Sequence, residues 1–102
     1  MIKLTVMYPN NVDLTFDKDY YLIKHGNLIA ELLGEAIIDS DVNFGIASAS
    51  PTEPAPYAVI ANITFKSMES FEKSFGANAE TILKDLPNFT NAEPVVQLSE
   101  VV

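Results

Sequence analysis

Four segments of the chain alternate hydrophobic and polar residues, which is the pattern of half-buried β-strands. We predict strands at residues 2–8, 42–48, 57–65 and 95–101. The third is the clearest, because every second residue from Tyr57 to Phe65 is apolar. Between the second and third strands, the sequence SPTEPAP is too rich in proline for either a strand or a helix, so we expect a loop.

Two further segments repeat their apolar residues every three or four positions, as amphipathic helices do. The first runs from Asp17, which is a good N-cap residue, to about Gly34, a typical C-terminal stop. The second begins after Ser67 and ends at Pro87, which cannot continue a helix. Gly76 lies in the middle of this second helix and can bend or weaken it.

The order of these elements is βαββαβ, which predicts a ferredoxin-like α+β fold. Two helices would cover one face of a four-stranded antiparallel sheet. The length of 102 residues suits a single domain over residues 1–102.

The second face of the predicted sheet is poor in charge. Its thirteen positions carry one charged residue; they are Lys3, Thr5, Met7, Asn43, Gly45, Ala47, Ala58, Ile60, Asn62, Thr64, Val95, Gln97 and Ser99. A sheet face in contact with water normally carries more charge. We therefore predict that a second copy of the chain packs there and that the protein is a homodimer.

Composition excludes several classes of function. The net charge is −8, and the six basic residues are dispersed lysines, so the chain has no basic stripe for nucleic acid or for an anionic membrane. It has no cysteine, no glycine-rich phosphate loop and no nucleophile elbow. No apolar run approaches the roughly 18 residues of a membrane span, and the start lacks the features of a signal peptide. We expect a cytoplasmic protein.

The single histidine, His25, lies near the middle of the buried face of the first helix. On a helical wheel it falls within about 60° of Tyr21, Leu28 and Leu32. One interpretation is a neutral core histidine that a carbonyl or a tyrosine hydroxyl satisfies, and the residues alone favour it. The other is an acid–base or ligand-orienting group that faces a pocket between helix and sheet.

Other polar residues are weaker candidates. Tyr20 falls on a different sector of the wheel, toward solvent or a dimer partner. Asn62 and Gln97 lie inside strands, where each could face a cavity or satisfy the sheet. The aspartates lack the spacing of a calcium loop, and one histidine without cysteine does not make a transition-metal site. We predict no metal and no cofactor.

Three stretches of the chain resemble the EthD family: VMYPN at residues 6–10, FDKDYYLIKH at 16–25 and LPNFTNAEPVVQLSEV at 86–101. The resemblance implies a dimeric α+β barrel, in which two ferredoxin-like sheets meet. It places the family histidine on His25 and the preceding tyrosine pair on Tyr20 and Tyr21. Family members often follow the histidine with Met-Pro, where this chain has Gly26 and Asn27.

The leading hypothesis is a small dimeric enzyme acting on a small apolar or aromatic metabolite. His25 would be the acid–base group in an isomerisation, a cofactor-independent oxygenation or related chemistry, with Tyr21 orienting it. The candidate ligand contacts are Tyr8, Tyr20, Asn62 and Gln97. Two alternatives remain open: a non-catalytic binding or carrier protein, and a structural dimer whose own side chains fill the pocket.

Overall fold

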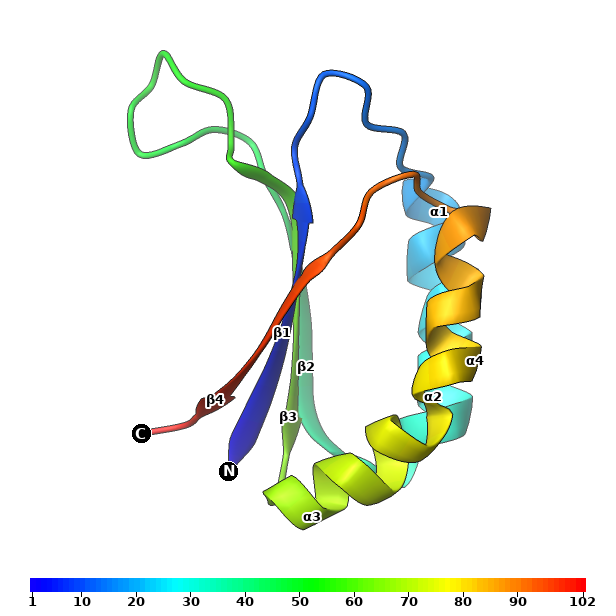
Figure 1. The fold of residues 1–102 in the computed structure, drawn as a ribbon. Coiled ribbons are helices and arrows are strands. Elements are labelled where there is room, and N and C mark those ends of the chain that lie inside the picture. Colours follow the sequence, from blue (N-terminus) through cyan, green and yellow to red (C-terminus); the bar gives the residue numbers. More distant parts are fainter.

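A four-stranded antiparallel sheet with two helical segments on one face forms the structure, a computed structural model that describes all 102 residues (Figure 1). The strands are β1 (Ile2–Pro9), β2 (Ile37–Phe44), β3 (Tyr57–Phe65) and β4 (Val95–Glu100). They lie in the order β2-β3-β1-β4, and every neighbouring pair is antiparallel. The predicted ferredoxin-like α+β fold is confirmed.

The first helical segment consists of α1 (Lys18–Tyr20), a π-helical turn η1 (Tyr21–His25) and α2 (Gly26–Leu33). Asp17 caps it as predicted, because its side chain accepts a hydrogen bond from the backbone N–H of Tyr20. Gly34 begins a short 3₁₀ turn that leads into β2. The predicted bounds of this helix are therefore confirmed, whereas the π turn was not foreseen.

The second helical segment consists of α3 (Met68–Phe71), a π turn η3 (Glu72–Gly76) and α4 (Ala77–Asp85). Ser67 is its N-cap, as predicted, and Gly76 is the last residue of the π turn. The 3₁₀ turn η4 (Leu86–Asn88) follows α4. No helix in either segment has the length and apolar character needed to cross a membrane.

The predicted position of the second strand was wrong. β2 begins five residues earlier, at Ile37, and ends at Phe44, while Ile46 lies beyond it and is fully exposed. An irregularity in the pairing with β3, between Ile37 and Asp39, interrupts the alternation that would have revealed the start of this strand.

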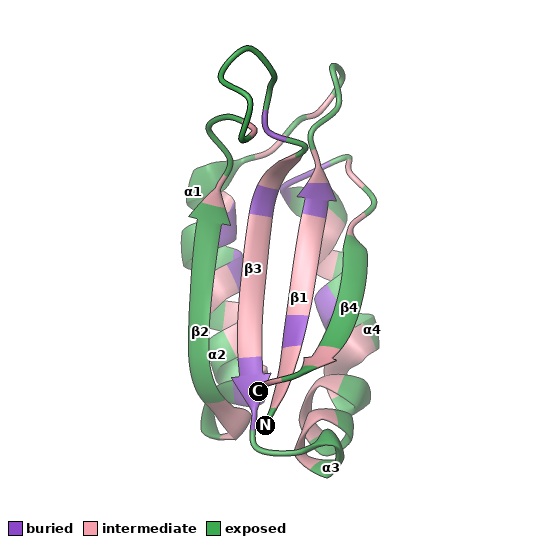
Figure 2. Cartoon of the chain, turned by 90° about the vertical axis from the view of Figure 1, so that its left-hand side faces the viewer, coloured by how far each residue is buried: buried purple, intermediate pink, exposed green.

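This shift changes the face of the sheet that the helices leave uncovered, which Figure 2 shows. Asp39 and Asp41 pair with Thr64 and Asn62 of β3 and join that face, whereas Gly45 lies outside the strand. The face therefore carries two more charges than the sequence predicted. The inner strands β1 and β3 are buried or half-buried along their length, and both edge strands are mostly exposed (Figure 2).

Side chains between the sheet and the helices form two buried clusters. One consists of Leu4, Leu33, Phe65 and Ile82. The other is largely aromatic and consists of Tyr8, Tyr21, Val59 and Phe89. His25 lies against this aromatic cluster, with its ring 4.7 Å from that of Phe89.

Candidate functional site

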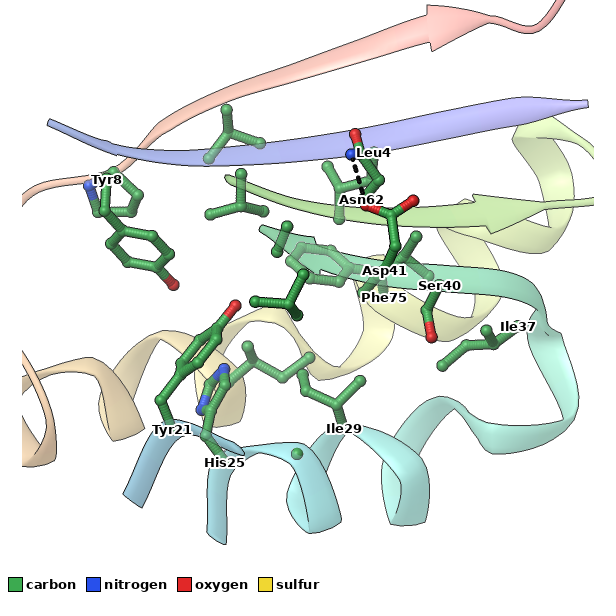
Figure 3. A pocket seen from close by; sticks show the side chains of 18 of the residues that line it. Leu4, Tyr8, Tyr21, His25, Ile29, Ile37, Ser40, Asp41, Asn62 and Phe75 are labelled. Atoms are coloured by element: carbon green, nitrogen blue, oxygen red, sulfur yellow. Dashed lines mark hydrogen bonds between the residues drawn. The ribbon is translucent and has the colours of Figure 1, made fainter. Parts of the chain in front are cut away.

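A pocket of about 230 Å³ lies between the sheet and the two helical segments (Figure 3). Its walls come from all four strands and from α2, η1 and α4, and 16 of its 22 lining residues are hydrophobic. No lysine or arginine lines it. The pocket is therefore suited to an uncharged, largely apolar molecule.

His25 is held in this wall by an aspartate from the other helical segment. The Nδ1 atom of His25 lies 2.8 Å from Oδ2 of Asp85, the last residue of α4. An ionised carboxylate only accepts hydrogen bonds, so Nδ1 carries the hydrogen. In the neutral imidazole, Nε2 is then the basic nitrogen.

Asp85 receives three hydrogen bonds from side chains. Besides His25 on Oδ2, its Oδ1 accepts from the Tyr20 hydroxyl at 2.7 Å and from the Asn88 amide at 3.0 Å. Burial acts to raise the pKa of Asp85, but these hydrogen bonds outweigh burial and hold the pKa below its ordinary value. The carboxylate beside His25 is therefore ionised near neutral pH.

Aromatic rings fix the orientation of the imidazole. The Tyr21 ring stacks on His25, with a centroid distance of 5.5 Å and an angle of 16° between the planes. The π turn η1 supplies both residues, and π turns occur frequently at functional sites. Phe89 packs against both rings, and Tyr20 in turn stacks on Phe89. The imidazole therefore has little freedom to rotate.

Among the buried residues of the pocket wall, three polar side-chain atoms have no hydrogen-bond partner in the chain. They are the hydroxyls of Tyr8 and Tyr21 and the Nε2 atom of His25. No fully buried side-chain nitrogen or oxygen of the protein lacks a partner, so each of these three atoms keeps some accessible surface, and all three residues line the pocket. Figure 3 shows both hydroxyls pointing into it.

The three residues themselves are nonetheless almost wholly buried, with exposed fractions of 2% for Tyr8, 5% for Tyr21 and 7% for His25. Burial raises the pKa of Tyr21 to about 12 and, with the nearby Tyr21 hydroxyl, raises that of Tyr8 further. Both hydroxyls are therefore protonated near neutral pH.

The other candidate residues lie elsewhere. Tyr20 does not line the pocket; its ring stacks on Phe89 and its hydroxyl donates a hydrogen bond to Asp85. Asn62 lies at the margin of the pocket, but its amide already bonds to Thr5 and Asp41, the latter shown as a dashed line in Figure 3. Gln97 is exposed, bonds to a nearby serine and does not line the pocket.

Sequence reasoning missed Asp85, which lies 60 positions from its histidine partner. One signal was present: on the second helix, Asp85 falls beside the apolar stripe that contains Ile82 and Leu86. A lone carboxylate next to a buried stripe needs a partner, and the only histidine was available. No group of three or more acidic or histidine side chains is placed to hold a metal ion.

The structure thus defines a small ferredoxin-like α+β protein with an apolar pocket beside a histidine–aspartate pair. The family model of the EthD domain matches residues 10–93, and the chain belongs to the EthD family. An EthD-like protein from Ralstonia eutropha is 33% identical, with a TM-score of 0.91 over 99% of this chain and 91% of that one.

More distant structures share the fold. An EthD family protein from Bacillus halodurans is 16% identical, with a TM-score of 0.70 over 100% of this chain and 99% of its own. A protein of unknown function from Bacteroides fragilis, described as dimeric and ferredoxin-like, is 11% identical, with a TM-score of 0.57 over 98% of this chain and 95% of its own. Among curated proteins, no match was found.

Proposed function

We propose that the protein is a small enzyme that moves a proton on a small apolar or aromatic metabolite, with His25 as the acid–base group. The observation that carries this proposal is the arrangement around His25: Asp85 holds Nδ1, Nε2 has no partner in the chain, and the residue lines an apolar pocket. An ionised aspartate on Nδ1 fixes the tautomer and stabilises the imidazolium that forms when Nε2 accepts a proton.

The pocket supports the size and polarity of the proposed substrate. An engineered apolar cavity of about 150 Å³ binds benzene, so a pocket of about 230 Å³ has room for a substituted single ring or a compact bicyclic molecule. The unfilled space supports this proposal over the alternative of a structural dimer whose own side chains fill the pocket.

Tyr21 is proposed as the orienting residue of the pair. Its ring stacks on the imidazole with the two ring centroids 5.5 Å apart, and both residues belong to the same π turn. Proton removal from carbon is a step that isomerisation and cofactor-independent oxygenation have in common. The arrangement therefore supports the shared step without selecting one overall reaction.

Base-catalysed opening of nitrobenzisoxazole tests the proposal, because this compact bicyclic probe needs only a base in an apolar environment. Nε2 would take the ring C–H proton, the N–O bond would break, and a nitrile and a coloured phenolate would form. We expect saturable turnover in wild type that His25→Gln abolishes. The exposed neighbour of His25 provides the matched control, Lys24→Gln, which should leave the rate unchanged.

The carrier alternative makes the opposite prediction for the same probe. If nitrobenzisoxazole binds to wild type and is recovered unchanged, or if His25→Gln turns it over as fast as wild type, the acid–base proposal is wrong. Binding without turnover would then favour a carrier that uses the same pocket.

We also propose that the protein is a homodimer, formed through the sheet face that the helices leave uncovered. Met7 lies on this face between Ile60 of β3 and Val95 of β4, so three apolar side chains form a row across the sheet. The related fold from Bacteroides fragilis is described as dimeric, which supports this assembly.

A further inference from the structure

We infer that the hydroxyls of Tyr8 and Tyr21 together bind a carbonyl oxygen, and that the substrates are neutral cyclic or aryl ketones with an acidic C–H beside the carbonyl. This inference rests on the proposed function, since it names the substrate class for the base at His25. It assigns a role to two polar groups that the histidine–aspartate pair does not use.

The two hydroxyls come from different elements and converge on one region of the pocket. Tyr8 lies near the end of β1 and Tyr21 begins the π turn η1, and their ring centroids are 5.9 Å apart. In Figure 3 the oxygen of each ring points toward the other and into the pocket. Phe16 and Phe89 pack against both rings and limit their movement.

Unpaired hydroxyls in an apolar pocket are unfavourable unless a ligand or water satisfies them. A carbonyl oxygen has two lone pairs and can accept from both tyrosines at once. A carboxylate or phosphate fits less well, because no lysine or arginine lines the pocket and the protein carries a net charge of −8. The pocket therefore favours an oxygen that is neutral when bound and becomes negative only during the reaction.

The position of His25 completes this assignment. Tyr21 contacts His25 ring to ring, so the proposed oxygen site adjoins the base. A hydrogen on the α-carbon of a ketone is close to the carbonyl oxygen, as this arrangement requires. Nε2 takes that proton, the C–H electrons form a C=C bond, and the carbonyl electrons move to the oxygen. The imidazolium then returns the proton to carbon, so the step needs no oxidant or reductant.

β-Tetralone with an isotope-labelled carbonyl carbon tests the oxygen site, because its carbonyl stretching frequency falls when the oxygen accepts hydrogen bonds. We expect difference infrared spectra of wild type to show a bound band well below the frequency in an apolar solvent. Tyr8→Phe and Tyr21→Phe should each reverse part of this shift, and the double variant should reverse nearly all of it. Tyr57→Phe is the matched control, because Tyr57 does not line the pocket.

A bound band that both single variants leave unchanged would overturn the carbonyl site, and so would failure of β-tetralone to bind to wild type. Tyr8→Phe, Tyr21→Phe and the double variant remove only hydroxyls that have no partner in the chain. We therefore expect all three variants to fold, and circular dichroism checks this.

Exchange of the acidic protons of β-tetralone for solvent deuterium separates this inference from the proposed function. His25→Gln should retain the shifted band and lose the exchange, whereas each Tyr→Phe variant should slow exchange by about 100-fold. If His25→Gln exchanges protons as fast as wild type while the carbonyl band remains shifted, His25 is not the base, and the carbonyl site at the two tyrosines is still supported. If proton exchange depends on His25 but no tyrosine variant moves the carbonyl band, the two tyrosines do not bind the carbonyl oxygen, and the proposed role of His25 as the base is still supported.

Discussion

The hydrogen bond from His25 to Asp85 determines which imidazole nitrogen can act as a base. The position of His25 on the buried face of its helix could be predicted from the sequence, because the surrounding leucines follow helical spacing. Its partner could not, because the contact joins the middle of the first helical segment to the end of α4, 60 positions away. The sequence therefore predicted a candidate base without the group that orients it.

Replacing Asp85 by asparagine should greatly weaken the base. The amide can turn its NH₂ group toward Nδ1, which favours hydrogen on Nε2 and removes the lone pair from the pocket. We expect the His25-dependent rate with nitrobenzisoxazole to fall by at least about 100-fold in Asp85→Asn.

The exposed Asp39 provides a control for that change, because Asp39→Asn removes one negative charge at a residue that does not line the pocket. It should retain the wild-type rate. Equal rates for wild type and Asp85→Asn would show that the carboxylate does not set the tautomer.

The buried tyrosines should make the protein sensitive to alkali. The folded state raises the pKa of Tyr21 from 10.0 to about 12, so the neutral phenol stabilises the folded state relative to the unfolded one. This contribution is complete below pH 10 and is lost as the pH rises through about 12. In an ultraviolet titration of tyrosinate, Tyr21→Phe should remove one tyrosine that ionises only at high pH. The free energy of unfolding of this variant should also fall less steeply over that pH range. A titration curve without any late step in wild type would contradict the burial argument.

Among the elements, strands β1 and β3 and both helices could be predicted because their apolar periodicity is uninterrupted. β2 was misplaced because an irregularity breaks its alternation and because polar residues are tolerated on an edge strand. The π turns η1 and η3 left no signal in the sequence, since their residues keep helical backbone angles and the apolar spacing of an ordinary helix. The site therefore depends on a local geometry that periodicity does not reveal.

Two glycines next to these turns allow stability and pocket shape to be separated. Gly26 and Gly76 both have right-handed helical angles, and a Cβ at either position would make no close contact. Gly26→Ala and Gly76→Ala should each raise the free energy of unfolding by about 0.5–1 kcal/mol, because alanine loses less backbone entropy in a helix. Urea denaturation measures both changes.

Only Gly26 lines the pocket, so the two variants should differ in ligand binding. Gly26→Ala should weaken the binding of β-tetralone, whereas Gly76→Ala should leave it unchanged. Because Gly26 stands where EthD proteins often have methionine, this comparison also tests whether that position shapes the pocket. Equal binding by both variants would show that it does not.

At the scale of the whole molecule, the uncovered sheet face determines the expected assembly. Its charge is higher than the sequence suggested, because Asp39 and Asp41 lie on it, yet these charges belong to the edge strand β2. The centre, on the inner strands β1 and β3, is occupied by Met7 and Ile60 and by the hydrogen bond between Thr5 and Asn62, and Val95 on the edge strand β4 continues the apolar row. A centre of uncharged residues with a charged margin is typical of a protein interface.

Ile60→Lys should therefore convert the protein to a monomer, because the dimer would bury an unpaired ammonium group at the centre of this face. Sedimentation equilibrium of wild type should give twice the chain mass at micromolar concentration, and Ile60→Lys should give the chain mass. Ile23→Lys makes the same chemical change on the helical side, at a residue that is 61% exposed, and should remain dimeric. A monomeric wild type, or an Ile60→Lys variant that stays dimeric, would place any partner on another surface. The pocket lies between the helices and the opposite face of the sheet, so we expect the monomeric variant to bind its ligand as well.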